Sequence, residues 1–389
     1  MKKVSTGLDT LNTRIPECLK GRDLGLLANP ASVDHRFTHA RQIIQELFPG
    51  RLRALLSPQH GFFAEKQDNM IESCHSRDAE LDIPVYSLYS ETRIPTPEMF
   101  QDIDTLVIDI QDVGTRVYTF IYTISYCLET AARAGKSVVI LDRPNPIGGC
   151  QVEGNVLENE FSSFVGRFPI PMRHGMTVGE ISQYFNKTQD IDCDLTVIPM
   201  EGWKRDMYWQ DTGLAWIPPS PNLPTPLSVM VYPGQVIFEG TNVSEARGTT
   251  LPFEQFGAPY MDIKAMAKRL DQSIPGIHLR PIHFEPTSGK WANDTCRGFH
   301  IHVADRELYK PYLASLILFQ EILRAHPQFQ FKQPPYEYEY DRLPMDLILG
   351  SKSLRLAISE MTDPKELEKG WQKKLNRFIE ASAPFHLYE

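Results

Sequence analysis

The amino-acid sequence predicts an α/β protein, and three observations lead to that fold class. Short apolar, β-branched runs alternate with helical patterns through the first 200 residues, as they do in strand–helix–strand units. The predicted strands are apolar at nearly every position, which is typical of strands covered on both faces. After residue 216 this alternation gives way to dense proline, glycine and asparagine. The sequence therefore favours a Rossmann-like, mostly parallel sheet with helices on both faces, plus a smaller C-terminal α+β domain.

The elements of the first part are defined by composition and spacing. The predicted strands are the apolar runs at 24–28, 51–57, 84–89, 105–110, 137–141 and 194–199. The predicted helices are 38–48, a short segment from residue 96, 117–133 and a segment opening at residue 177. In the helix over 117–133 apolar residues recur at i, i+4 and i+7 and form one buried face, and Gly135 provides its stop. Thr177 and Glu180 have the spacing of a capping box.

A change in composition marks the second part. Residues 216–259 are rich in proline and then in glycine, threonine and asparagine, so we expect an ordered loop that crosses between domains. Beyond it, helical patterns at 261–272 and 312–326 enclose a strand pair, which is typical of a small α+β domain. We therefore predict two domains, a Rossmann-like domain over residues 1–250 and an auxiliary α+β domain over residues 251–389.

Charge and composition exclude several classes of protein. Over 389 residues, 40 Lys+Arg stand against 49 Asp+Glu, a net charge of −9, which argues against a dedicated nucleic-acid binder. There is no run of about 18 apolar residues to span a membrane, and the N-terminal lysines are not followed by the apolar run of a signal peptide. We therefore expect a cytoplasmic protein that does not contact membranes.

The common cofactor and nucleophile motifs are missing from the sequence. Neither glycine pattern of dinucleotide- and phosphate-binding loops occurs, so no nucleotide cofactor is expected. The six cysteines are scattered without zinc-like spacing, and neither H-E-x-x-H nor a G-x-S-x-G nucleophile elbow is present. We therefore predict neither a bound metal nor a catalytic serine.

Polar residues follow the predicted strands, where open parallel sheets bind ligands. His60 lies on a tight turn between Pro58 and Gly61, and the sequence fits a hydrogen-bonded structural histidine as well as a ligand. Glu65 follows two aromatic residues, and burial against them would raise its pKa and suit it as a general acid. A plain surface glutamate fits the same sequence.

The turn after the strand at 105–110 combines two carboxylates with an arginine. Asp109 and Asp112 beside Arg116 fit a structural ion pair or a pair that orients a ligand. Their D-x-x-D spacing differs from the D-x-D of haloacid-dehalogenase phosphatases, which disfavours an aspartyl-phosphate route. Tyr118, on the following helical pattern, fits either the crevice or the core.

Further candidates occupy the next strand end and the crossing segment. Asp142, Arg143 and Asn145 surround a proline, and Arg143 could hold a carboxylate through two guanidinium nitrogens. His174 either caps the following helix or belongs to the site. The crossing segment combines glutamate, asparagine and arginine, a mixture that is common in sugar and carboxylate recognition: Glu239, Asn242, Glu245 and Arg247.

Several long motifs resemble those of one bacterial family. In chain order they are SPQHGFFAEKQ, SLYSETRIPTPEM, DIQDVGTRVYTFIYT, LDRPNPIGG, PIPMRHGMTVGE, PSPNLPT and YPGQVIFEGTNVSEARGTTLPFEQFGAP. With these motifs, from about residue 24 onward, the sequence resembles the NamZ-type exo-β-N-acetylmuramidases. The resemblance implies hydrolysis of terminal β-linked N-acetylmuramic acid from the non-reducing ends of peptidoglycan fragments. It also implies a Rossmann-like catalytic domain, an auxiliary domain and a cleft between them.

The resemblance also implies a set of site residues. Those that stand in matching motifs are Asp109, Asp112, Arg116, Asp142, Arg143, Asn145, His174, Asn222, Glu239, Asn242, Glu245 and Arg247. One position departs from the family, whose members commonly have Pro-Glu-His-Gly where this chain has Gln59 before His60. Because a glutamine side chain cannot supply the proton, we predict Glu65 as the catalytic acid.

The remaining roles follow from the chemistry of the predicted reaction. Glycosidases usually use two carboxylates, although the 2-acetamido group of the substrate can replace the nucleophile. We predict Glu239 or Glu245 as the partner of Glu65, with Asp109 orienting or polarising. The cations predicted for the lactyl carboxylate of muramic acid are Arg116, Arg143 and Arg247. The other predicted substrate contacts are Gln59, His60, Asp112, Tyr118, Asp142, Asn145, His174, Asn222 and Asn242.

The sequence thus predicts a glycoside hydrolase of muramyl sugars that serves cell-wall recycling. One alternative is a metal-dependent amidase or peptidase acting on wall fragments, which chelator-sensitive activity would reveal. Another is a non-catalytic muropeptide-binding protein that has lost turnover through Gln59. Tight binding without hydrolysis, and hydrolysis restored by Gln59→Glu, would distinguish that protein from an enzyme.

Overall fold

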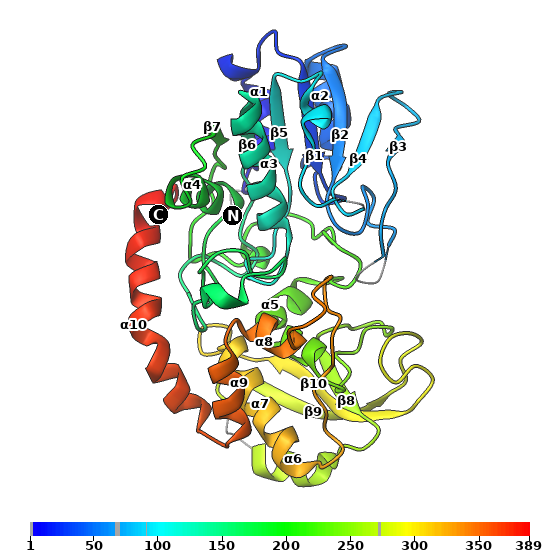
Figure 1. The fold of residues 1–389 in the computed structure, drawn as a ribbon, viewed down its shortest axis with the longest axis vertical. Helices are drawn as coiled ribbons and strands as arrows, with labels where there is room; N and C mark the ends of the chain where they lie inside the picture. The colour runs from blue at the N-terminus through cyan, green and yellow to red at the C-terminus, as the bar shows by residue number, and fades with distance from the viewer. Residues whose placement is uncertain (1–2, 67–70, 91, 271–273) are drawn as a thin grey trace.

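The computed structural model describes residues 3–66, 71–90, 92–270 and 274–389, and Figure 1 shows two bodies stacked along the longest axis. The first body contains a seven-stranded sheet with the order β3-β4-β2-β1-β5-β6-β7. Its strands are β1 (Leu24–Ala28), β2 (Leu52–Ser57), β3 (Ser76–Arg77), β4 (Pro84–Ser87), β5 (Thr105–Asp109), β6 (Ser137–Leu141) and β7 (Asp194–Ile198). The fold class predicted from the sequence is confirmed.

The order of the strands reverses between β1 and β5. All neighbouring strands pair in parallel except β3, which is antiparallel to β4. The chain first adds β2 and β4 on one side of β1 and then returns to its other side with β5, β6 and β7. Loops that leave two such strands diverge, and the crevice between them is where open α/β sheets bind ligands. The topology therefore directs attention to the loops after β1 and β5.

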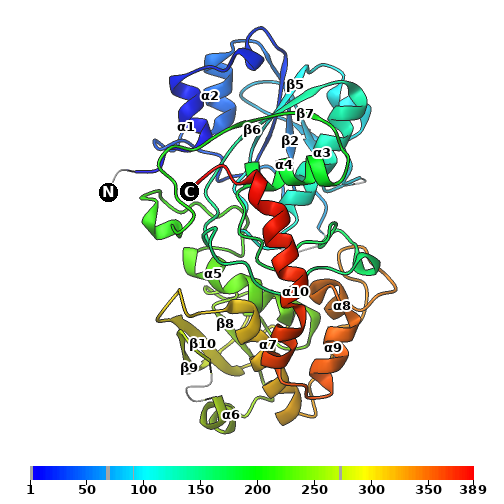
Figure 2. The same cartoon turned by 90° about the vertical axis from the view of Figure 1, so that its left-hand side faces the viewer.

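Helices cover both faces of this sheet (Figures 1 and 2). They are α1 (Gly7–Thr13) and α2 (Ala40–Leu47) on one face and α3 (Phe120–Ala134) and α4 (Val178–Thr188) on the other. The alternation of side chains along β5 explains this arrangement. Val107 belongs to the apolar cluster of α1 and α2, whereas Leu106 and Ile108 belong to the cluster that includes α3. Both faces of the strand are thus buried, as its apolar sequence predicts.

The second body is built on a three-stranded antiparallel sheet with the order β8-β10-β9. Its elements are α5 (Pro226–Gln235), η5 (Val236–Gly240), β8 (Gln255–Ala258), α6 (Ile263–Leu270), β9 (Ile277–Phe284), β10 (Cys296–Val303), α7 (Pro311–Ala325), α8 (Pro344–Leu349) and α9 (Lys352–Ser359). The predicted strand pair and both predicted helices are present. The last two residues of the helix predicted over 261–272 lie outside the described residues.

The prediction of a loop over residues 216–259 is wrong for its middle part, which forms α5 and η5, and for residues 255–258, which form β8. Thr225 accepts a hydrogen bond from the backbone N–H of Ser228 and caps α5, and a proline occupies the first turn, where its missing N–H costs nothing. Gly234 suggests a break in the sequence, but here it permits close packing. A Cβ at Gly234 would overlap the carbonyl group of Pro311 at the start of α7.

The last helix, α10 (Pro364–Ser382), returns from the second body to the first (Figure 2). The ring of Phe378 lies 5.6 Å from that of Tyr184 in α4. Beyond the helix, the hydroxyl group of Tyr388 donates to Asp142 at 2.6 Å. The end of the chain therefore holds the two bodies together. The division at residue 250 stays a prediction.

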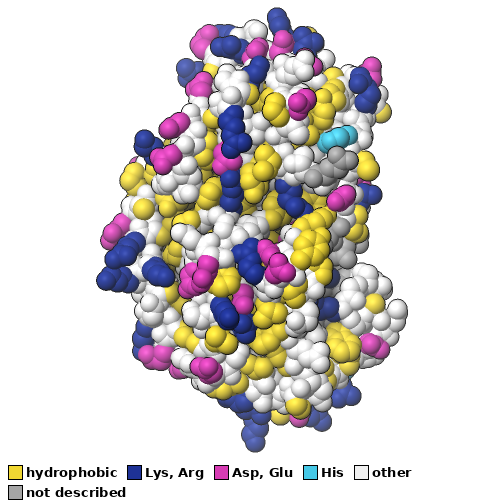
Figure 3. All heavy atoms as spheres, in the orientation of Figure 1, with side chains coloured by type: hydrophobic (Ala, Val, Ile, Leu, Met, Phe, Trp, Pro, Cys, Tyr) yellow, Lys and Arg dark blue, Asp and Glu magenta, His cyan; other side chains and the backbone are white. Residues whose placement is uncertain are grey.

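The outer surface shows no segregation of charge on the face drawn in Figure 3, where acidic, basic and apolar side chains are interspersed. Within the described ranges, no helix has both the length and the apolar character needed to cross a membrane.

Candidate active site

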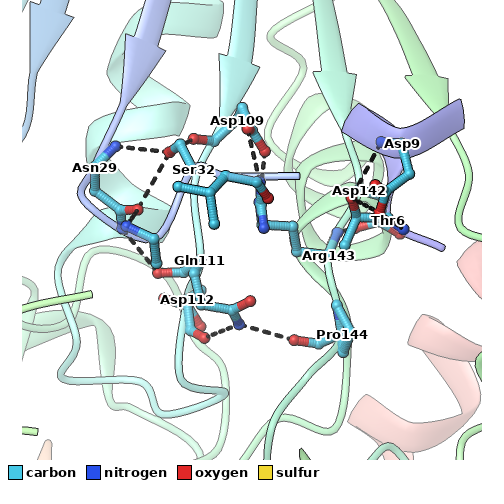
Figure 4. Close-up of polar contacts among 12 residues, drawn as sticks. Thr6, Asp9, Asn29, Ser32, Asp109, Gln111, Asp112, Asp142, Arg143 and Pro144 are labelled. Atoms are coloured by element: carbon cyan, nitrogen blue, oxygen red, sulfur yellow. Dashed lines mark hydrogen bonds and ion pairs between the residues drawn. The ribbon is translucent and has the colours of Figure 1, made fainter. Parts of the chain in front are cut away.

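The loops at the reversal of strand order are joined by buried hydrogen bonds (Figure 4). Nδ2 of Asn29, after β1, donates to the carbonyl oxygen of Gln111, after β5, at 3.1 Å. Nε2 of Gln111 donates in turn to the carbonyl oxygen of Pro144, after β6, at 2.9 Å. These side chains bind neighbouring loops, so they make this edge of the sheet rigid.

Asp109 and Arg143 form a buried ion pair at the same edge (Figure 4). Nε of Arg143 lies 2.5 Å from Oδ1 of Asp109 and Nη2 lies 2.8 Å from Oδ2, and the two side chains are 4% and 0% exposed. Nη2 also donates to the carbonyl oxygen of Val33. This two-point geometry is that of a structural ion pair, with Arg143 as the partner of Asp109.

Arg116 is fully buried, and its guanidinium group joins the two bodies. Nη1 donates to the carbonyl oxygens of Asn155 and Ile170, and Nη2 donates to those of Ile348 and Leu349 in α8. All four acceptors are backbone groups. The guanidinium group of Arg116 therefore binds backbone carbonyl groups of this protein.

Asp142 and Asn145, after β6, also bind neighbouring segments. Asp142 accepts hydrogen bonds from the hydroxyl group of Thr177 and the N–H of Gly179 at the start of α4, in addition to the bond from Tyr388. Nδ2 of Asn145 donates to the carbonyl oxygen of Met176 at 3.0 Å. Burial raises the pKa of Asp142 to about 6.

Asp112 and His174 face each other in a buried position. Nε2 of His174 lies 3.9 Å from Oδ2 of Asp112, and Nδ1 accepts from the N–H of Met176. Burial raises the pKa of Asp112 to about 7 and lowers the pKa of His174 to about 3. Oδ1 of Asp112 and Nε2 of His174 find no hydrogen-bond partner among the described residues. Of the two roles that the sequence leaves open for His174, capping of the following helix is not met, because Thr177 caps α4.

One cavity lies between the loops of the first body and the second body, with an empty volume of about 470 Å³ including its opening to solvent. Of the predicted site residues, it brings together Gln59, His60, Tyr118, Asn222, Glu239 and Arg247. Its wall also includes polar and aromatic residues that the sequence did not single out: Thr119, Ser220, Tyr232, Phe253, Tyr336 and Glu337.

Glu239 is held against one wall of this cavity. Its Oε1 accepts from Nη2 of Arg247 and its Oε2 accepts from the hydroxyl group of Tyr336, both at 2.7 Å. Nη1 of Arg247 is buried and has no hydrogen-bond partner among the described residues. The arginine therefore fixes one carboxylate and retains an unused donor.

Glu245 and Asn242 lie behind this wall. Glu245 accepts from Nζ of Lys290 at 2.7 Å and lies 3.5 Å from Nε of Arg247. Burial alone would raise the pKa of Glu245, but these two cations hold it below its ordinary value. Oδ1 of Asn242 accepts from the hydroxyl group of Tyr260, and its Nδ2 donates to the carbonyl oxygen of Gln328.

The lining of the cavity includes a second glutamate, Glu337, which contacts the first body. Oε1 of Glu337 accepts from Nε2 of Gln59 at 3.3 Å and Oε2 accepts from the hydroxyl group of Tyr89 at 2.6 Å. Oε1 of Gln59 accepts from Thr119 at 2.8 Å, which directs its amide N–H group to Glu337. The local sequence offers one sign of this residue, an acid between Tyr336 and Tyr338.

Three non-glycine residues that line the cavity have left-handed backbone conformations. They are His60 (φ 78°), Phe253 (φ 64°) and Glu337 (φ 48°). This region costs about 1–3 kcal/mol for such residues, and strained residues of this kind cluster at functional sites. The three residues are therefore a feature that this cavity shares with such sites.

Glu65 lies elsewhere. It is exposed and lines a separate cavity together with Gly61, Phe62 and Asp78. Phe63 is 62% exposed. Glu65 is therefore not buried against aromatic residues, which is the condition under which the sequence suggests a proton donor. Its role as the acid stays a prediction.

A group of potential metal ligands also lies away from the cavity with the two glutamates. Asp9, Asp34 and His35 place one ligand atom each within 4.8 Å of one another, and they line a cavity beside Arg143. Within the described ranges no other such group is found.

Comparisons with known proteins agree over the whole chain. The family models described as "Exo-beta-N-acetylmuramidase NamZ", N-terminal and C-terminal, match residues 24–227 and 230–388. A relative from Bacillus subtilis (strain 168), named "Peptidoglycan beta-N-acetylmuramidase NamZ", is 40% identical over 99% of this chain and 92% of its own length. Crystal structures of two DUF1343 family proteins from Bacteroides fragilis are similar. One has a TM-score of 0.89 at 34% identity and covers 100% of this chain and 99% of its own. The other has a TM-score of 0.77 at 27% identity, with 99% of both chains covered. The chain therefore belongs to the exo-β-N-acetylmuramidase NamZ family.

Proposed function

We propose that this protein is an exo-acting glycoside hydrolase that releases terminal β-linked N-acetylmuramic acid from peptidoglycan fragments, in the service of cell-wall recycling. The name of the Bacillus subtilis relative and the family descriptions support the reaction. The cytoplasmic location stays a prediction of the sequence. There the enzyme would act on imported fragments.

One observation carries the proposal: a single cavity joins polar side chains from both matched segments. Gln59 and His60 come from the first segment, and Glu239, Arg247 and Glu337 come from the second. Glu239 and Glu337 thus place two carboxyl groups in one cavity, the set that glycosidases usually use. The cavity is therefore the proposed active site.

Within this site, we assign Glu239 to the carboxylate that faces the reacting sugar. Arg247 and Tyr336 hold both of its oxygens in place, so the charge is fixed before the substrate arrives. A fixed negative charge stabilises the oxocarbenium-like transition state. The carboxylate of Glu239 can also accept a hydrogen bond from the N–H of the 2-acetamido group of the substrate.

The lactyl carboxylate of muramic acid requires a cation, and Arg247 is the proposed one. Of the three predicted arginines, Arg116 is occupied by backbone carbonyl groups and Arg143 by Asp109. Arg247 lines the cavity and has an unused Nη1. Arg247 contacts Glu239 through Nη2 and Glu245 through Nε, so the lactyl carboxylate would bind at Nη1.

The test is incubation of the purified protein with a disaccharide of N-acetylmuramic acid β-1,4-linked to N-acetylglucosamine. We expect stoichiometric release of both sugars, measured by chromatography and mass spectrometry. A protein that binds the disaccharide without releasing N-acetylmuramic acid would contradict the proposal and support the non-catalytic alternative. Activity that appears only with a divalent cation, on an amide bond, would support the metal-dependent alternative.

A further inference from the structure

We propose that Glu337 is the catalytic proton donor of this enzyme, held in place from the other body by Tyr89 and Gln59. The inference rests on the proposed function, since it concerns the glycosidic bond that the cavity would cleave. It assigns the acid to a residue of the second body, on the segment between α7 and α8.

The position of Glu337 fits a group that meets a substrate atom. Its side chain lines the cavity, while the residue is only 7% exposed. Each carboxyl oxygen accepts one hydrogen bond, from Gln59 and from Tyr89. A carboxyl oxygen has room for a second contact, so the group can hold its proton toward the cavity while both neighbours fix its orientation.

The two hydrogen-bond donors to Glu337, Gln59 and Tyr89, are both uncharged. Glu239, in contrast, accepts one of its hydrogen bonds from the charged guanidinium group of Arg247. Burial raises the pKa of Glu337, and the negative charge of Glu239 raises it further, whereas the bond from Tyr89 and the charge of Arg93 lower it. The net direction is upward. The charged and titratable groups that face Glu337 are Tyr89, Arg93, Tyr232, Glu239, Tyr336 and Tyr338.

The cavity thus contains two glutamates with different environments. Glu239 has a cationic partner and Glu337 has none within hydrogen-bond distance among the described residues. Two carboxyl groups in different environments are the usual arrangement of an acid and its partner in glycosidases. The backbone supports the same assignment, because Glu337 and Tyr338 are consecutive left-handed residues, with φ of 48° and 65°.

The proposed step balances as follows. The bond between C1 of the muramyl sugar and the bridging oxygen breaks, and its electron pair stays on that oxygen. The oxygen takes the proton of Glu337, which becomes a carboxylate. Water then adds to C1 and returns one proton to Glu337, so the enzyme is regenerated and one water is consumed for each bond.

Glu337→Gln tests the proposal with two substrates. The first is the muramyl-glucosamine disaccharide, whose leaving group needs a proton. The second is 4-nitrophenyl β-N-acetylmuramide, whose leaving group departs without one. We expect the variant to lose about 10²–10⁴-fold in kcat on the disaccharide and less than tenfold on the aryl glycoside. A merely structural role would lower both rates by the same factor.

The controls separate failure of this proposal from failure of the proposed function. Glu339→Gln makes the same change two residues away, at a residue paired with Arg342, and should leave both rates unchanged. Glu337→Asp retains an acid and should show the same selective loss to a smaller degree, which keeps the test usable if Glu337→Gln does not fold. The proposal is overturned if Glu337→Gln keeps more than a tenth of the disaccharide rate, or if it lowers both rates by the same factor. A selective loss in Glu65→Gln would then identify the acid that the sequence predicts. A wild-type protein inactive on both substrates overturns the proposed function itself.

Discussion

The hydroxyl group of Tyr89 donates a 2.6 Å hydrogen bond to Oε2 of Glu337, and this bond crosses between the two bodies. Tyr89 follows β4 of the parallel sheet, while Glu337 precedes α8 of the second body. The proposed acid therefore belongs to one body and is positioned by the other. An active site that is complete only when two bodies dock excludes water better than an open crevice does.

Tyr89→Phe should move the pH profile of the enzyme. The hydroxyl group lowers the pKa of Glu337, so its removal raises that pKa. A general acid works in its protonated form, and the alkaline limb of kcat/KM on the disaccharide should therefore shift to higher pH. We also expect kcat at pH 7 to fall by about 10–100-fold, because a hydrogen bond to the carboxylate that forms on Glu337 contributes about 1.5–3 kcal/mol.

Tyr309→Phe provides the matched control for this change. Tyr309 is also buried, and its hydroxyl group has no hydrogen-bond partner among the described residues. Tyr309→Phe should leave the pH dependence of kcat/KM on the disaccharide unchanged. The assignment of Glu337 would be contradicted if the alkaline limb of kcat/KM in Tyr89→Phe did not move, or moved to lower pH.

Asp109→Asn should affect stability far more than substrate binding. The substitution leaves Arg143 buried opposite a neutral amide, and breaking a buried ion pair costs about 3–5 kcal/mol. Urea unfolding should show this loss, with KM for the disaccharide unchanged. The double variant Asp109→Leu, Arg143→Met should recover part of the stability, since it removes both charges. A stable but inactive Asp109→Asn would instead favour the orienting role that the sequence predicts.

Local patterns in the sequence were sufficient for the elements of the first body. The apolar runs at 24–28 and 137–141 coincide with β1 and β6, because a strand buried on both faces consists almost entirely of apolar residues. The capping box at Thr177 begins α4 as predicted. The middle of the crossing segment was mistaken for a loop, because the packing of α5 against α7 outweighs the effect of Pro233 and Gly234 on the helix.

The site was harder to predict, for a reason that Gln59 and Glu337 illustrate. They are 278 positions apart and meet only because the two bodies dock. Arg116 shows the converse difficulty, since an arginine that binds backbone carbonyl groups and one that binds a substrate look the same in a motif. Predicted site residues such as Asp142 and Asn145 proved to hold neighbouring loops. Sequence reasoning thus found the edge of the sheet and six of the residues that line the cavity. It could not separate these six from residues that hold neighbouring loops, and it missed Glu337.

Arg247→Lys should reduce selectivity for muramic acid. Lysine retains the positive charge beside Glu239. It lacks the planar guanidinium group, which contacts Glu239 and Glu245 and still has Nη1 available for a substrate. We expect kcat/KM on the muramyl disaccharide to fall by about 10–100-fold, in line with about 1.5–3 kcal/mol for a hydrogen bond to a charged group. A disaccharide of two N-acetylglucosamine units lacks the lactyl group, and its slower hydrolysis should change by less than threefold. An equal loss on both substrates would contradict the lactyl contact.

Arg93→Gln should shift the alkaline limb of the activity profile in the same direction as Tyr89→Phe, through charge alone. The guanidinium group of Arg93 lies 3.9 Å from the ring centre of Tyr338 and 5.1 Å from that of Tyr89, and its charge lowers the pKa of Glu337. Removing the charge raises that pKa, so Glu337 keeps its proton to higher pH and activity persists there. Arg167→Gln is the matched control, because Arg167 also stacks on aromatic rings, those of Tyr126 and Phe168, and does not face Glu337. The measurement is the pH dependence of kcat/KM on the disaccharide at constant ionic strength. If the alkaline limb shifts in both variants, or in neither, that limb reports a group other than Glu337.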